Sequence, residues 1–570
     1  MTLSHSTDCP RSCPDPFRWT RDQIAAAWDD FADPEHPSQR QYAQQHQIPR
    51  STLGAWLRDD RLDDSDLDPE LVAFFRSGAG QRFLRRLVLA LFTVFVFGGA
   101  AGLRLLGRFL RLCQLDRFVA SSYGALHTLA KQLEKDLVAF AAEQRPRLAQ
   151  QMPRRTIALV PDENFHGPHP CLVAIEPVSN FILVECYRKH RDGDTWTTAI
   201  QEGVRDLPVE VVLLTSDRAS GLLRCARDGL EVPHSPDLFH GQRDLLKGIL
   251  LPLQRPIQQA HKELEHARGE LHRLQAEEQA APPEQRASIS VEEFAYIAGL
   301  LRQEQSAQRK LQQASEPKEQ VLAQVRGLAD DYHPFDRHSG RPVEATEMAP
   351  RLQQRLDRIE QVLEAGSLTL KGREALSKGR TWVVSLVAVV GWFWTVARTR
   401  VEELALSEEA ERQVYECLLP GVYWQAAADR ARTPDERDRL GRLAERLQEQ
   451  AWQTGGALAG LPEEERRQVE QVARETAGLF SRSSSCVEGR NGRLALHHHG
   501  QGRLSEQKLK ALTVIHNYLL KRADGTTAAE RFFGARPTDL FGWLLQRLPD
   551  LPRPAARRPP KATPTTPRAG

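Results

Sequence analysis

The chain has 570 residues and a formal net charge of +2, from 77 Lys and Arg against 75 Asp and Glu. This length gives room for roughly two to four domains with buried cores, and the near-neutral charge excludes nucleic-acid binding through a global positive field, leaving only local basic patches. The eight cysteines are scattered without a recurring Cys-x-x-Cys pair, so neither a zinc ribbon nor a disulfide framework is indicated, and a reducing cytoplasm fits best.

At the N-terminal end we expect a disordered segment and then a small helical domain. Residues 1–18 lack the charged and then apolar layout of a signal peptide. Over residues 19–61 the sequence predicts three short helices, with Ser38 as the N-cap of the second and Ile48-Pro49 as the turn before the third. The core of this domain is expected from apolar residues at the spacing of a helix-turn-helix: Ala43, Ile48, Leu53, Trp56 and Leu57.

A helix-turn-helix reads DNA with its second helix, whose first turns meet base edges in the major groove. In this chain those positions are Arg50, Ser51 and Thr52. The sequence therefore predicts a DNA-binding domain over residues 19–61. The alternative is a small helical domain that does not contact DNA.

Residues 62–150 are predicted to be an acidic linker followed by a helical region. The acidic run from Asp59 to Glu70 is typical of a solvated connector. Two uncharged apolar segments, Leu87 to Leu103 and Thr381 to Ala397, are short for a membrane span, which needs about 20 residues. We expect buried core or oligomer-interface helices there and no membrane contact, with membrane insertion as the alternative.

The composition changes to short β-rich runs over residues 151–241. The expected order is a strand over 156–160, a hairpin of strands over 170–175 and 181–187, a helix over 195–204, a strand over 209–214 and a last strand over 232–239. This is the order of the ribonuclease-H-like fold, in which the first and fourth strands lie side by side. The predicted fold class is α/β plus α.

Two of these strands end on an aspartate, and a third carboxylate stands far downstream. Asp162 follows the first strand, Asp217 follows the fourth, and Glu488 lies in a small polar and basic segment. Three such carboxylates are the hard oxygen ligands that two divalent cations, roughly 4 Å apart, require for phosphoryl transfer. The alternatives are that Glu163 replaces Asp162, that Asp217 only caps a turn, and that Glu488 only pairs with a surface arginine.

Asp237, with His240 one turn later, competes with Asp217 for the same role and is expected to be an accessory pair. Residues 242–480 are predicted to be almost wholly helical, beginning with an antiparallel helical hairpin from Gln258–Gln279 and Val291–Leu328. Residues 481–550 carry the third carboxylate, and the proline-rich basic stretch 551–570 is expected to be a disordered tail.

Several of these segments, taken together, resemble the catalytic region of bacterial insertion-sequence transposases of the DDE type. The resemblance rests on their order along the chain: Asp162 to His166, Val173 to Ser179, Thr195-Trp196, Ser216-Asp217, Asp237 to His240, Cys486 to Gly492, Ala511 to Asn517 and Asp524 to Phe533. It covers Thr156 to His240 and Arg482 to Gly534. The helical block between them resembles these enzymes only in its position along the chain.

The resemblance implies a ribonuclease-H-like catalytic domain, in two parts at 151–241 and 481–550, interrupted by a large helical insertion. It implies that Asp162, Asp217 and Glu488 bind two Mg²⁺ or Mn²⁺ ions and cleave and join double-stranded DNA at element ends and target, in a homodimer associated with the nucleoid. Arg490, Asn491 and Arg493 beside the site would hold DNA phosphates. The alternative is a transposase-derived DNA-binding protein without catalysis.

Overall fold

A computed structural model describes residues 21–33, 35–57, 67–165, 169–280, 290–365, 368–501 and 504–554. The expected disordered segment 1–18, much of the acidic linker and most of the tail 551–570 lie outside the described residues. The chain divides into two compact units, residues 152–491 and residues 1–151 with 492–570, each of which is described here by itself.

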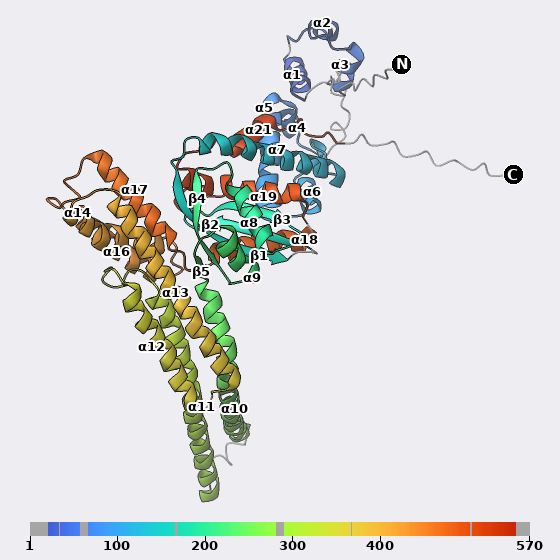
Figure 1. Ribbon diagram of the computed structural model, residues 1–570. Coiled ribbons are helices and arrows are strands. Elements are labelled where there is room, and N and C mark those ends of the chain that lie inside the picture. Colours follow the sequence, from blue (N-terminus) through green and yellow to red (C-terminus); the bar gives the residue numbers. More distant parts are fainter. Residues whose placement is uncertain are drawn as a thin grey trace, which may run out of the picture. The chain divides into compact units, whose positions relative to one another are not determined.

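The unit of residues 152–491 contains one five-stranded sheet with the order β3-β2-β1-β4-β5 (Figure 1). Its strands are β1 (Arg155–Phe165), β2 (Pro170–Glu176), β3 (Phe181–Tyr187), β4 (Val209–Ser216) and β5 (His234–Pro236). The first three form an antiparallel meander, and β1, β4 and β5 run parallel. The side-by-side placement of the first and fourth strands, expected from the sequence, is confirmed.

The hairpin between β2 and β3 turns where the sequence predicted a turn. The Glu176 carboxylate accepts hydrogen bonds from the backbone N–H groups of Val178 and Ser179, both at 2.8 Å. Asn180 closes the turn with φ of 64°, a left-handed conformation that Asn tolerates better than most residues. Both strands are almost completely buried and mainly apolar, apart from Glu176 and Glu185.

Two strand predictions need correction. The first strand does not end at Val160: antiparallel pairing with β2 continues to Phe165, so Asp162 lies within β1 rather than after it. The fifth strand is only His234–Pro236, because Leu238 already begins a helix. The connections are α8 (Gly193–Val204), which contacts β3, and α9 (Ser220–Arg224), which continues as a π-helix over Cys225–Gly229.

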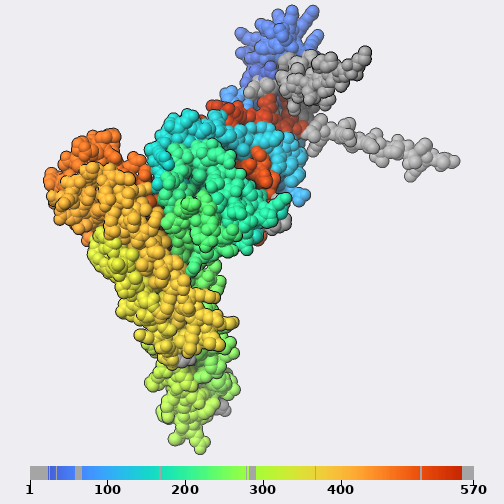
Figure 2. Space-filling view, in the orientation of Figure 1, coloured from blue at the N-terminus to red at the C-terminus, as the bar shows by residue number. Residues whose placement is uncertain are grey.

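A long antiparallel hairpin follows the sheet, made of α10 (Leu238–Ala280) and α11 (Val291–Asp331) (Figure 1). Cross-helix ion pairs fix its register: Arg268 with Glu304 at 2.9 Å and Lys310 with Glu263 at 3.1 Å. Figure 2 shows the far end of this hairpin as a projection formed by α10 and α11. The predicted helical hairpin is therefore confirmed.

The rest of this unit is a helical layer packed against the base of the hairpin. It comprises α12 (Ala345–Glu364), α13 (Leu370–Glu402), α14 (Glu408–Gln413), a π-helix (Val414–Leu418), α15 (Leu419–Ala428), α16 (Pro434–Ala451) and α17 (Glu463–Leu479). Its core is rich in buried aromatic side chains, among them Tyr332, Phe335, Phe393, Trp394 and Trp424. Because α17 contacts β1 and α13 contacts β5, this core continues onto the sheet.

Within the described part of the chain, α13 is the one helix long and apolar enough to cross a membrane. Its apolar residues Leu386, Phe393 and Trp394 are buried in the helical core, and the Trp394 indole donates to the Val343 carbonyl at 2.8 Å. The apolar composition of Thr381 to Ala397 thus matches that of a core helix, as expected.

The second unit begins with α1 (Arg21–Ala32), α2 (Gln39–Gln45) and α3 (Arg50–Leu57). Ser38 caps α2 in a reciprocal capping box with Gln41, which confirms the predicted N-cap. The three helices enclose the expected small core, built from Ile24, Ala27, Tyr42, Ala43, Ile48, Leu53 and Trp56. The predicted residues 19–20 and 58–61 of this domain lie outside the described residues.

The remaining helices of this unit are α4 (Pro69–Arg76), α5 (Gly78–Leu91), α6 (Leu103–Leu112), α7 (Tyr123–Ala149), α19 (Glu506–Tyr518), α20 (Ala528–Phe533) and α21 (Leu540–Arg547), with α19 and α21 packed on α7. The apolar segment Leu87 to Leu103 is not one continuous helix. It runs from α5 into a π-helix that ends at Gly98, and Ala100, with φ of 58°, then directs the chain away.

Candidate functional site

The two aspartates that the sequence singled out meet where the parallel ladder of the sheet ends. The last paired residues of β1 and β4 are Leu159 and Leu214. Asp162 lies three residues further along β1, and Asp217 directly follows β4. The negative charge of Asp217 raises the pKa of Asp162, which places the two carboxylates within electrostatic reach of each other.

Asp162, rather than Glu163, faces this cluster. Asp162 Oδ2 accepts a hydrogen bond from the Asn491 amide at 2.9 Å, and its Oδ1 accepts one from the Glu163 N–H at 2.9 Å. The Glu163 side chain instead forms an ion pair with Arg191. Neighbouring residues of a strand point to opposite faces, so this division is the expected one.

Asp217 caps the turn before α9, which is the role that the sequence offered as the alternative to metal binding. Its Oδ1 accepts a hydrogen bond from the Ala219 N–H at 3.0 Å, ahead of α9. The residue is exposed and the next one, Arg218, has φ of 70°. One carboxylate oxygen therefore holds the turn, and the side chain remains accessible to solvent.

Asp237 is a structural junction rather than a free ligand. Its Oδ1 accepts from the His240 backbone at 2.6 Å and lies 3.0 Å from the His240 Nδ1, while its Oδ2 accepts from the Ser484 N–H. Burial alone would raise the pKa of Asp237, but these hydrogen bonds outweigh it and lower the pKa. Both oxygens of Asp237 are therefore engaged in hydrogen bonds, one of them to His240.

The helix α18 (Ser485–Gln501) carries the third carboxylate into this region. Glu488 Oε1 lies 4.0 Å from His240 Nδ1, and its side chain is 42% exposed. The charge of His240 also lowers the pKa of Asp162. His240 thus lies 4.0 Å from Glu488 and interacts electrostatically with Asp162 and Asp217, although the four residues come from β1, the end of β4, α18 and α10.

Arg490 is buried rather than exposed to a DNA phosphate, contrary to the expectation from its position beside the site. Its guanidinium is buried and bonded through two nitrogens to the Glu185 carboxylate of β3, at 2.7 and 2.6 Å. Sequence reasoning missed Glu185, although one charged residue within the apolar run Phe181 to Tyr187 is a signal, because a buried charge needs a partner. Arg493, by contrast, is exposed.

Asn491 is likewise turned inward rather than toward solvent. Its amide nitrogen donates to Asp162, and its amide oxygen is buried without a hydrogen-bond partner. Asn491 stands three residues after Glu488, so both lie on the same face of α18. On this face Asn491 contacts Asp162 of β1, and Glu488 lies near His240.

The environment of Asp162 disfavours the ionised form of its carboxyl group. Burial raises the pKa of Asp162 to about 7, the Glu163 N–H opposes the shift, and the negative charges of Asp217 and Glu163 add to it. The hydrogen bond to Asp237 raises the pKa of His240 against its burial. A positive charge placed among these carboxylates would relieve the repulsion.

The donors suit a hard divalent cation, although no three His, Cys, Asp or Glu side chains in the described ranges are gathered into a ready cage. Mg²⁺ is usually held by one or two carboxylates together with waters and substrate phosphates, so an open arrangement is what such an ion uses. The buried and unpartnered amide oxygen of Asn491 is a further donor of the right type beside Asp162.

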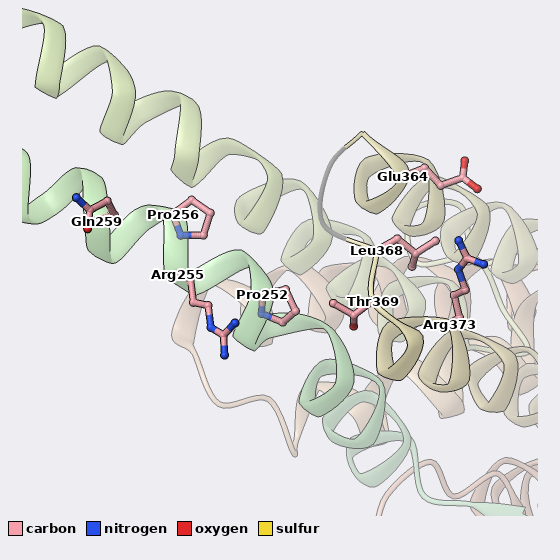
Figure 3. Close-up of a pocket in the computed structure, with 8 residues that line it drawn as sticks. All are labelled: Pro252, Arg255, Pro256, Gln259, Glu364, Leu368, Thr369 and Arg373. Carbon is pink, nitrogen blue, oxygen red and sulfur yellow. The ribbon is translucent and has the colours of Figure 1, made fainter.

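A separate groove of about 700 Å³ lies in the helical region and contains none of these residues (Figure 3). Its lining comes from α10, the end of α12, the segment that joins α12 to α13 and the start of α13: Pro252, Arg255, Pro256, Gln259, Glu364, Leu368, Thr369 and Arg373. It has no cluster of carboxylates and does not take part in the site described above.

Comparison with known protein families gives one match, over residues 414–560, to a family described as "Family of unknown function (DUF6399)". The matched segment includes Glu488 and Asn491 and excludes Asp162 and Asp217. A search of the curated proteins found no match.

The buried ion pair allows a test of the position of Arg490. Arg490→Met should lower the free energy of unfolding by about 3–5 kcal/mol, because it leaves the Glu185 charge buried and uncompensated. Combining it with Glu185→Leu should recover most of that loss, and Arg493→Met should change little. Urea unfolding of the four proteins measures this. If Arg490→Met unfolds at the same urea concentration as the unmodified protein but binds DNA more weakly, Arg490 contacts DNA after all.

The pKa of Asp162 predicts a pH dependence of stability. Its folded value of about 7 lies above its ordinary 3.8, so the carboxylate destabilises the folded chain increasingly as pH rises from about 4 to about 7. Asp162→Asn cannot ionise, and its melting temperature should rise relative to the unmodified protein over this range. Asp192→Asn, at a carboxyl whose pKa is lowered by hydrogen bonds from Thr195, should show no such gain. If the difference in melting temperature between Asp162→Asn and the unmodified protein does not change with pH in metal-free buffer, the raised pKa of Asp162 is contradicted.

Proposed function

We propose that this protein is a DNA transposase of the DDE type, which cleaves the ends of an insertion sequence and joins them to target DNA. The observation that carries the proposal is that His240 lies 4.0 Å from Glu488 and interacts electrostatically with both Asp162 and Asp217. The strand order β3-β2-β1-β4-β5, with β1 and β4 parallel, also supports a ribonuclease-H-like domain completed by α18. In this view α10 to α17 form the insertion before the last catalytic helix.

The chemistry needs charge neutralisation at a phosphodiester. Two Mg²⁺ or Mn²⁺ ions, when bound, would supply an activated water or 3′-hydroxyl and stabilise the leaving oxygen. Asp162, Asp217 and Glu488 are the residues that would hold them. Asp237 fixes His240 at the centre of the cluster and, through Ser484, ties the start of α18 to the end of β5.

Recognition of the element ends is assigned in this proposal to α1 to α3. Arg50 and Ser51 at the start of α3 are exposed and Thr52 is half-buried, so the first turn offers polar groups to DNA. Arg493 is exposed and suits a phosphate contact. The proposal includes double-stranded DNA as partner, a homodimer as the active form and a cytoplasmic, nucleoid-associated location.

The second candidate function is a transposase-derived DNA-binding protein without catalysis. The lack of a ready three-ligand cage among the described residues favours it. The two functions differ in one property, which is divalent-cation-dependent cleavage of DNA that carries the sequences flanking the gene.

Asp217→Asn tests the catalytic proposal. The amide keeps the turn hydrogen bond to Ala219 but loses the charge that a cation needs. Cleavage of end-containing DNA in Mg²⁺ should fall at least about a hundredfold, equal to about 2.7 kcal/mol of transition-state stabilisation, while binding of the same DNA is retained. Asp228→Asn, an exposed aspartate paired with Arg227, is the matched control. Undiminished nicking by Asp217→Asn would remove Asp217 from the site.

Arg50→Ala tests the DNA-binding role of α3. Affinity for the element ends should fall by about 1–3 kcal/mol if Arg50 reads a base, or equally for all DNA if it contacts only phosphate. Arg40→Ala, exposed on the neighbouring helix α2, is the control. Fluorescence anisotropy with specific and scrambled duplexes separates these cases. Equal affinities of Arg50→Ala and the unmodified protein for both duplexes would show that DNA is recognised elsewhere.

A further inference from the structure

We propose that Asn491 belongs to the cation site: its amide nitrogen positions Asp162, and its amide oxygen is an additional neutral ligand. This inference rests on the proposed function and assigns to Asn491 a role other than the phosphate contact expected from the sequence. It starts from two observations, the 2.9 Å hydrogen bond to Asp162 Oδ2 and the buried amide oxygen that has no partner.

The hydrogen bond orients the Asp162 carboxylate. One Asp162 oxygen is held by the Glu163 backbone and the other by Asn491, so the carboxylate cannot rotate freely. Ligands that are held by outer hydrogen bonds bind metal more tightly, because less freedom is lost on binding. Asn491 therefore prepares Asp162 for a cation.

The amide oxygen needs a partner of its own. A buried carbonyl group without a hydrogen bond or ion is unfavourable, and buried polar groups in folded proteins are normally satisfied. In the orientation that donates to Asp162, the amide of Asn491 turns its oxygen away from that hydrogen bond. A divalent cation satisfies such an oxygen, since Asn carbonyls are ordinary ligands of hard cations.

A neutral ligand also suits the charge of the cluster. Asp162 is already subject to the negative charges of Asp217 and Glu163, and a fourth carboxylate there would increase the repulsion. An amide adds an oxygen without adding charge. The position of Asn491 is rigid because the preceding residue, Arg490, anchors α18 to Glu185 of β3.

Mn²⁺ binding to the full-length protein tests this role apart from catalysis. Free Mn²⁺ is measured by electron paramagnetic resonance, with and without a DNA duplex, and melting temperatures are recorded with and without Mn²⁺. Asn491→Ala should weaken Mn²⁺ binding about 10- to 100-fold and reduce the rise in melting temperature that Mn²⁺ causes. Asn491→Asp, which keeps an oxygen, should show a rise at least as large as that of the unmodified protein.

The controls separate the possible failures. Leu496→Ala, at an exposed position of the same helix, should bind Mn²⁺ as the unmodified protein does. If Asn491→Ala and Asn491→Asp both keep full Mn²⁺ binding while Asp217→Asn loses it, Asn491 is only structural and the inference is overturned. If the unmodified protein binds no Mn²⁺, the two-cation proposal itself fails, and the role of Asn491 fails with it.

Discussion

The buried ion pair between Arg490 and Glu185 is the contact on which the candidate site depends. The two residues are 305 positions apart, and their side chains are almost fully buried. A buried charge pair stabilises little by itself, but it tolerates only one arrangement, because either charge left alone is costly. It therefore holds α18 on the sheet, where Asn491 reaches Asp162 of β1 and Glu488 lies near His240.

A second junction at Asp237 fixes the other end of the same geometry. Its carboxylate binds His240 at the start of α10 and Ser484 just before α18. The chain leaves the sheet at the first of these points and returns at the second, after the whole helical region. One buried carboxylate thus connects the two ends of residues 238–484 beside the sheet.

The burial of Asp162 beside other carboxylates connects the structure to the proposed chemistry. Asp162 is partly buried, close to Asp217 and Glu163, and its pKa of about 7 reflects that environment. Such a cluster favours a proton or a cation. Under the proposed function the cation is divalent, and the phosphate of a DNA substrate and the amide oxygen of Asn491 would share its coordination.

The sequence by itself determined the local elements: the strands and the hairpin turn at Asn180, the N-cap at Ser38, the long helical hairpin, and the aspartates at or near the ends of two strands. These follow from periodicity, turn chemistry and capping, which act over a few residues. Only the tertiary structure decided which side chains meet. It continued β1 past Asp162 through pairing with β2, turned Arg490 and Asn491 inward, and engaged both oxygens of Asp237. These outcomes depend on contacts between residues up to 329 positions apart, and no local pattern encodes the partner of a buried charge.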